Sequence, residues 1–299
     1  MKNAKRFSPF TIRHSPFAIR HSPFAIRHSP FAIMRIAILT YESHQSNLMT
    51  HRLLTEFPGQ VVGIMRSDVI VAGKNTWQSM WFLLKRTGLG FVFRKGMEII
   101  LSRVAASLNK TQLPPLKHLG QEFDVPVVQA KNINAPDSLA TLASWQPDLI
   151  ISVYLNQLIK KKIIEMPPKG VINVHPALLP RNRGLFPYFW ALANGDAETG
   201  VTVHWVAPKF DTGEILVQRP LPIEAEDTVI SLARKSAELG ANLLVEALTL
   251  IETGNPPYLP QNPEQATYHS WPTPADARRF KQRGRRYGSL AETWKDLTE

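Results

Sequence analysis

Residues 170–184 read Gly-Val-Ile-Asn-Val-His-Pro-Ala-Leu-Leu-Pro-Arg-Asn-Arg-Gly, in which an apolar run ends in polar side chains. The run Val171–Val174 has the length and β-branched composition of a buried strand. Comparable runs precede it along the chain at Ile36–Leu39, Val61–Met65, Val125–Val128 and Leu149–Val153. Near-continuous apolar strands separated by helical stretches are typical of a parallel sheet covered on both faces. The sequence therefore predicts an α/β fold with a Rossmann-like, mostly parallel sheet and helices on both faces.

Further helices and strands are expected between and after these runs. Their patterns place helices over Asp137–Ser144 and Leu158–Glu165, a locally paired couple of strands over 201–206 and 214–221, and a long helix from Asp227, the N-cap candidate, to Thr253. No Gly-x-Gly-x-x-Gly motif follows a strand, and no Gly-Lys-Ser/Thr loop occurs. These absences from the sequence weaken the interpretation as a nucleotide-dependent oxidoreductase or an NTPase.

The chain of 299 residues carries a formal net charge of +11 and contains no cysteine. Residues 1–33 hold six basic side chains and no acidic one, and residues 272–299 contribute +3, so residues 34–271 carry only +2. This nearly neutral middle weakens any inference of nucleic-acid binding from overall charge. The lack of cysteine excludes thiol nucleophiles, disulfides and thiolate metal sites, and a cytoplasmic location fits it. No run of 18 apolar residues occurs, so no transmembrane segment is expected.

Three parts of the chain differ in composition. Residues 1–33 contain a seven-residue repeat, Arg-His-Ser-Pro-Phe-Ala-Ile, and the proline in every unit opposes a coiled coil. We interpret this part as a disordered extension or a start assigned too early, with the folded protein beginning at Met34. Residues 34–255 are expected to form the main domain. Residues 256–299 are expected to form a short extension, first Pro-rich and then basic.

Asn173 and His175 end the strand Val171–Val174, and a spacing of two puts both side chains on one face of an extended segment. In open α/β sheets, ligands bind at the carboxyl ends of the strands. An amide and an imidazole that face the same point suit an oxygen that gains negative charge. The alternative is a polar strand end with a histidine that only satisfies its own hydrogen bonds.

A second polar segment, Phe210-Asp211-Thr212-Gly213-Glu214, lies between the two later strands. A carboxylate on such a loop would orient an imidazole and favour its protonated form. Asp-Thr-Gly also occurs in aspartic proteases, but that chemistry needs two carboxylates that share a proton. This chain has one copy of the motif in an α/β context, which disfavours the protease interpretation.

Together these segments resemble the 10-formyltetrahydrofolate-dependent formyltransferase family. The motifs that carry the resemblance are Asn173-Val174-His175, Leu178-Leu179-Pro180, Arg183-Gly184, Asp196 followed by Gly200-Val201-Thr202, and Asp211-Thr212-Gly213. The resemblance implies that Asn173, His175 and Asp211 are catalytic. It implies that the folate is bound by Gln157, Leu158, Ile159, Leu178, Leu179, Pro180, Ala207, Pro208, Lys209 and Phe210. Pro176-Ala177 stands where the family usually has Gly-Ser, so any contact of that serine is in doubt.

The reaction implied by the resemblance is transfer of the formyl group of 10-formyltetrahydrofolate, the co-substrate, to an amine without a metal. A hydrolase that releases formate, or a folate-binding protein without transfer activity, is the alternative. Family members act on amino-sugar nucleotides, glycinamide ribonucleotide or methionyl-tRNA. We expect a small amine such as an amino-sugar nucleotide here, with methionyl-tRNA as the alternative, because the 46 residues after Thr253 are too few for the tRNA-binding β-barrel of the methionyl-tRNA enzymes.

Two segments depart from the family pattern. The connection 67–124 is unusually long and mixes aromatic with basic residues. Core packing of a helix pair is one interpretation, and a lid over the acceptor or an interfacial patch is the other. The basic run 278–286 is interpreted as a solvated helix face or flexible arm, with a contact for phosphates or anionic lipids as the alternative.

Overall fold

The computed structural model describes residues 33–67, 71, 74–108, 110–111 and 113–298. The predictions for the repeat fall on residues 1–33, of which all but Ile33 lie outside the described residues. Residues Met34–Glu299 cluster as one unit that includes the C-terminal extension.

Seven strands form the central sheet, in the order β3-β2-β1-β4-β5-β7-β8. Their bounds are β1 Ile36–Tyr41, β2 Val61–Ser67, β3 Val127–Ala130, β4 Leu149–Val153, β5 Val171–His175, β7 Glu198–Trp205 and β8 Ile215–Pro222. The first five are parallel to their neighbours, whereas β7 runs antiparallel to both β5 and β8. The predicted α/β class and the late antiparallel couple of strands are confirmed.

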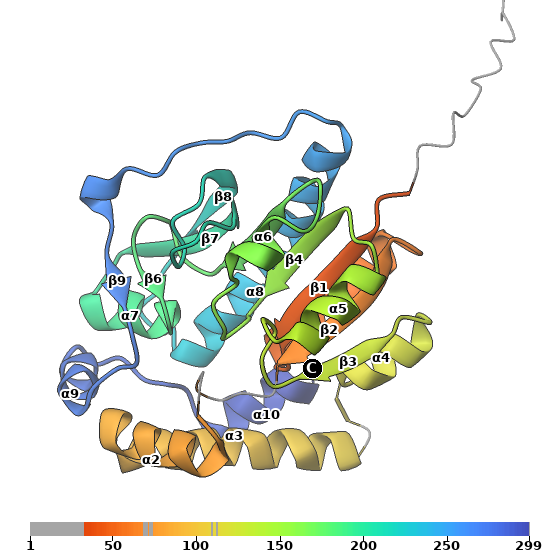
Figure 1. The fold of residues 1–299 in the computed structure, drawn as a ribbon. Coiled ribbons are helices and arrows are strands. Elements are labelled where there is room, and N and C mark those ends of the chain that lie inside the picture. Colours follow the sequence, from red (N-terminus) through yellow and green to blue (C-terminus); the bar gives the residue numbers. More distant parts are fainter. Residues whose placement is uncertain (1–32, 68–70, 72–73, 109, 112, 299) are drawn as a thin grey trace, which may run out of the picture. The chain divides into compact units, whose positions relative to one another are not determined.

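Helices cover both faces of the sheet because each inner strand is apolar on both sides. In β1, Ile36 and Ile38 join one core, and Ala37 and Leu39 join the other. The first core is closed by α1 (His44–Glu56), α4 (Leu116–Glu122) and α8 (Val229–Glu252), and the second by α5 (Pro136–Ser144) and α6 (Lys161–Ile164). Figure 1 shows α5 in front of β1 and β2, with α8 on the opposite side of the sheet.

Three predicted boundaries are wrong. The N-cap of α8 is Thr228, whose side chain accepts from the Ser231 amide, whereas Asp227 accepts from the Ser231 hydroxyl and the Lys235 ammonium. The helix expected over Leu158–Glu165 is the four-residue α6. The strand expected over Val125–Val128 begins two residues later.

The C-terminal extension packs on the main domain. Its first part forms the short helix η1 (Pro263–Gln265) and β9 (Tyr268–His269), which pairs with β6 (Arg183–Gly184). Its basic part forms α9 (Pro274–Gln282), whose Phe280 is buried against α7 (Pro187–Asn194). The last helix, α10 (Leu290–Thr298), lies against α3 and α8.

The long connection after β2 forms two helices, α2 (Thr76–Thr87) and α3 (Leu89–Ser107), joined at Gly88 (Figure 1). Core packing accounts for only part of this pair. Phe91 is buried, but Trp77, Trp81 and Phe93 are 86%, 59% and 68% exposed. In the described part of the chain, no helix is both long and apolar enough to span a membrane.

Candidate active site

The polar end of β5 meets the antiparallel strand β7. Asn173 lies opposite His204 in the strand register, and His175 lies opposite Thr202. Because alternate residues of a strand share a face, Asn173 and His175 point to the same side of the sheet, as the sequence predicts. The side-chain amide of Asn173 donates to Nε2 of His204 at 3.1 Å. Both histidines are almost completely buried.

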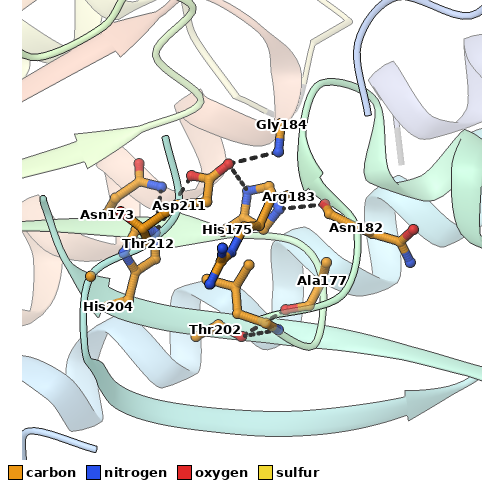
Figure 2. A network of polar contacts seen from close by, with 12 residues as sticks. Asn173, His175, Ala177, Asn182, Arg183, Gly184, Thr202, His204, Asp211 and Thr212 are labelled. Atoms are coloured by element: carbon orange, nitrogen blue, oxygen red, sulfur yellow. Dashed lines mark hydrogen bonds and ion pairs between the residues drawn. The ribbon is translucent and has the colours of Figure 1, made fainter. Parts of the chain in front are cut away.

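Asp211 lies between these two histidines (Figure 2). One carboxylate oxygen is 3.7 Å from Nδ1 of His175 and accepts the Gly184 backbone N–H at 2.8 Å. The other is 3.7 Å from Nε2 of His204. Asp211 itself has a left-handed backbone, with φ of 53°. The loop between β7 and β8 thus brings the Asp211 carboxylate next to the polar side chains at the end of β5.

Gly213 is needed to close this loop so tightly. A Cβ atom added at Gly213 would lie 1.7 Å from the backbone oxygen of Trp205. No side chain fits at that distance, so any larger residue has to move the loop that carries Asp211. The Asp-Thr-Gly sequence is explained here by the close approach of two backbone segments.

The pKa of Asp211 is well below its usual range. Burial alone would raise this pKa, but the neighbouring His175 and His204 imidazoles and the Gly184 amide, which donates to the carboxylate, outweigh burial. The carboxylate therefore stays ionised at neutral pH, and the side chain is only 10% exposed.

The two ring nitrogens of His175 have different partners. Nε2 lies 2.9 Å from the backbone oxygen of Asn182, and because a carbonyl only accepts, Nε2 carries the proton. Nδ1 faces Asp211. When His175 is protonated on both nitrogens, it meets an acceptor on each side. His175 therefore donates to a substrate oxygen only by exchanging the Asn182 carbonyl for it.

A network around Thr202 supports the loop that follows His175. The Thr202 hydroxyl donates to the Ala177 carbonyl at 2.7 Å, and it accepts from the Leu179 amide and from Gln218. Gln218 also donates to the Leu179 carbonyl at 3.0 Å. Pro176-Ala177, the departure from the family pattern, is held in this network through backbone atoms alone.

The C-terminal extension braces the site from the other side. The Gln261 amide donates to the backbone oxygens of Asp211 at 3.0 Å and Gly213 at 2.6 Å, and its oxygen accepts from the Arg183 guanidinium at 2.6 Å. The Thr267 hydroxyl accepts the Asn182 amide at 2.7 Å. Residues some fifty positions after Asp211 in the sequence thus hold both the loop that carries Asp211 and the loop that carries Asn182.

We call Asn173, His175, His204 and Asp211 the polar group. A hollow of about 400 Å³ lies beside it. It is lined by Leu158, Arg183, Pro208, Lys209, Phe210, Thr212 and Tyr268. Four of these are among the residues implied to bind folate, namely Leu158, Pro208, Lys209 and Phe210. Arg183, Thr212 and Tyr268 were not singled out as binding residues from the sequence.

The other residues implied to bind folate are placed differently. The Gln157 side chain is buried and bonded to Ser67, the Lys131 carbonyl and the Ile133 amide. Ile159 belongs to the apolar core below the sheet, and Leu179 is 3% exposed. Pro180 is also buried, while Leu178 and Ala207 are half-buried and lie outside the lining of the hollow. None of these six residues lines the hollow.

The sequence interpretation did not single out His204, Gln261 or Thr267. A signal for His204 was present, since Thr202 and His204 alternate on a predicted strand as Asn173 and His175 do. Gln261 and Thr267 lie in a Pro-rich stretch with no periodic pattern, so nothing local marks them. Within the described residues, no group of three or more His, Asp or Glu side chains is arranged to hold a metal ion.

The mostly parallel sheet of this α/β protein thus carries a buried carboxylate, two imidazoles and an amide at the end of β5, beside the hollow. Residues 102–248 match the formyl transferase family. This match agrees with the resemblance that the motifs around Asn173 and Asp211 predict.

Curated relatives are methionyl-tRNA formyltransferases. The Nitrosomonas europaea protein is 38% identical over 180 residues, covering 58% of this chain and 56% of that protein. The protein of Synechococcus sp. (strain JA-3-3Ab) is 43% identical over 156 residues, covering 52% and 48%. The chain thus spans about half the length of the curated relatives it matches.

Solved structures share the fold at low sequence identity. A sugar N-formyltransferase from Shewanella sp. FDAARGOS_354 aligns with a TM-score of 0.54 and 19% identity, covering 79% of this chain and 76% of that one. Glycinamide ribonucleotide transformylase 1 from Symbiobacterium toebii has the same TM-score and identity, covering 76% and 94%. At this identity the likeness extends to the fold alone.

Proposed function

We propose that this chain transfers the formyl group of 10-formyltetrahydrofolate to the nitrogen of an acceptor amine. The observation that carries the proposal is the convergence of Asn173, His175 and Asp211 at the end of β5, beside a hollow that the folate loops line. The match of residues 102–248 to the formyl transferase family supports the same reaction. This combination favours an enzyme over a folate-binding protein without activity, because binding alone needs no buried charged group.

The hollow suits the co-substrate by its chemistry. Phe210, 44% exposed, and Tyr268, 59% exposed, offer aromatic faces, while Lys209 and Arg183 offer positive charge to carboxylates. When bound, 10-formyltetrahydrofolate supplies an activated formyl group.

The polar group supplies a donor for negative charge and an acceptor for a proton. Asn173 has two amide hydrogens, and His204 accepts one of them, which leaves the second for a substrate oxygen. His175, held beside the ionised Asp211, stabilises the same oxygen when protonated and takes part in moving the proton from the amine. Asp211 keeps the ring oriented and its positive charge compensated.

We propose a small amine as the acceptor, with an amino-sugar nucleotide as the first candidate. The supporting observation is the distribution of charge. Residues 74–110 alone carry seven basic residues and one acidic residue, so the rest of 34–271 has a net charge of −4. Outside residues 74–110, this part of the chain therefore lacks the excess of positive charge that attracts a phosphate backbone. The names of the curated relatives favour methionyl-tRNA as the second candidate.

The test uses purified full-length chain with 10-formyltetrahydrofolate and each acceptor in turn. Formylated product is measured by mass spectrometry, and free formate is measured without acceptor. Formylation of an amino-sugar nucleotide that is independent of salt supports the proposal. Efficient, salt-sensitive formylation of methionyl-tRNA overturns the choice of acceptor, and formate release without any transfer overturns the transferase itself.

A further inference from the structure

The helix pair α2–α3 presents apolar side chains to solvent. We define the hairpin face by its exposed apolar residues, which are Trp77, Met80, Trp81, Leu89, Phe93, Ile99, Ile100 and Val104. Their exposed fractions run from 41% for Met80 and Val104 to 86% for Trp77. Monomeric proteins rarely expose contiguous apolar patches larger than a few hundred Å², and larger ones mark interaction sites.

The exposed apolar residues of α3 form a stripe along one side of that helix. In α3, Leu89, Phe93, Ile100 and Val104 recur at helical spacing on one side, and the half-buried Gly96 lies between them. The opposite side of α3 carries Phe91, whose ring meets Phe186, Trp271 and Tyr287 edge-on, and the fully buried Ala105. The helix is thus apolar on both its packed and its open side.

The helix α2 repeats this arrangement. Trp77 and Trp81 lie one turn apart, and the buried Ser79 and Leu83 lie on the other side of the helix. The ammonium of Lys85 sits 4.8 Å from the centre of the Trp81 ring. An apolar ring and a positive charge therefore lie side by side on the exposed surface of α2.

Positive charge surrounds the stripe. Residues 74–110 contain Glu98 as their single acidic residue, and it is paired with Arg94 and Lys95. An open hollow of about 540 Å³ lies at α2, lined by Lys74, Gln78, Trp81, Phe82, Lys85 and Arg86. Three cations around one hollow match an anionic group such as a phosphate.

We propose that the hairpin face docks on the surface of an anionic phospholipid bilayer, with the stripe among the acyl chains and the hollow around a lipid phosphate. Trp and Phe on the apolar side and Lys and Arg beside them are the composition of helices that lie in the membrane interface. A second copy of the chain fits less well, because two faces of charge +6 repel each other. Nucleic acid fits less well too, because Leu, Ile and Val offer no hydrogen bonds to its edges.

Flotation of the full chain with vesicles tests this proposal. One set contains phosphatidylglycerol and phosphatidylcholine in equal parts, and the other contains phosphatidylcholine alone. We expect the chain to float with the anionic set, and the binding to weaken as salt rises. Each basic residue near an anionic surface contributes about five-fold in affinity, so K85Q with R86Q together should weaken binding about 25-fold. W77Q with W81Q should weaken it at least ten-fold.

Matched controls replace exposed residues outside the hairpin. K117Q with K169Q removes two exposed lysines, and Leu259→Gln removes an apolar side chain that is 56% exposed. Both controls should bind vesicles like the unaltered chain, and circular dichroism should show all variants folded. Equal flotation with neutral and anionic vesicles, or none with either, overturns the proposal. So does a dimer in sedimentation that W77Q with W81Q abolishes, or tRNA binding that K85Q with R86Q abolishes while vesicle binding persists.

Discussion

Proteins usually bury apolar groups and expose charged ones. The end of β5 and the hairpin face each depart from this rule, in opposite ways. At β5 the molecule buries charge, with Asp211 enclosed by His175 and His204. At α2–α3 it exposes apolar surface, with Trp77 almost fully open to solvent. Burying a charge costs free energy unless partners surround it, and exposing a tryptophan forgoes the gain of burial. Each region therefore points to something outside the chain, a substrate in the first case and a surface in the second.

The largest expected effect concerns Asp211 and His175. Asp211→Asn keeps the shape of the side chain but removes the charge between the histidines, and His175→Ala removes the ring. Each variant should lower turnover on the order of a hundred- to a thousand-fold, which is the usual effect of losing one such group. Folate binding, followed by fluorescence titration, should change much less, because ground-state binding and transition-state stabilisation are separable.

The hairpin provides the contrast to this prediction. W77Q with W81Q should leave turnover with a soluble acceptor unchanged, since neither residue lines the hollow beside Asp211. Near-normal turnover of Asp211→Asn would contradict the proposed mechanism. A large loss in W77Q with W81Q would instead tie the hairpin to the reaction.

A second prediction sets two aromatic side chains of the same helix pair against each other. Phe91→Ala should lower the free energy of unfolding by about 3 kcal/mol, because a buried ring in contact with three other rings is lost. Trp77→Gln should change it by less than about 0.5 kcal/mol, because the side chain is exposed. Urea titration of both variants measures the difference. Equal losses would show that Trp77 is covered in solution.

A third prediction concerns Gln261, which holds the loop of Asp211 from outside the main domain. Gln261→Ala removes the amide that donates to the Asp211 and Gly213 backbone oxygens, and it should lower stability by roughly 1–2 kcal/mol. As a positioning residue it should lower turnover about ten-fold while the pH profile keeps its shape. The control is Gln265→Ala in η1, whose side chain is exposed. A change in the pH profile would place Gln261 in direct contact with the proton transfer.

The sheet and the polar group were predictable because both rest on local patterns. Apolar runs mark the strands, and a spacing of two fixes that Asn173 and His175 share a face. The role of Gln261 was not predictable, because its contacts span about fifty residues between two loops without periodicity. The hairpin face was not predictable for another reason. A helix such as α3 shows the same apolar spacing whether a side is buried or open, so only the structure separates Phe91 from Phe93.

The last prediction concerns α10, the helix that packs against α3 and α8. Asp296 in α10 is 6% exposed, and its Oδ1 lacks a hydrogen-bond partner. Burial, together with nearby carboxylates, raises its pKa to about 6 in spite of the positive Arg234. The carboxylates that face it are Glu238, Glu292 and Glu98.

Because the folded-state pKa lies above the ordinary value of 3.8, ionisation of Asp296 destabilises the fold. The cost is absent below the ordinary value, grows as pH rises toward 6, and is complete above it. Asp296→Asn should therefore raise Tm by roughly 6 °C at pH 8 and leave it unchanged at pH 4. Asp137→Asn, at an exposed position in α5, should show no such dependence on pH. No gain at either pH would mean that the carboxylate stays solvated, and that α10 does not bury it against α3 and α8.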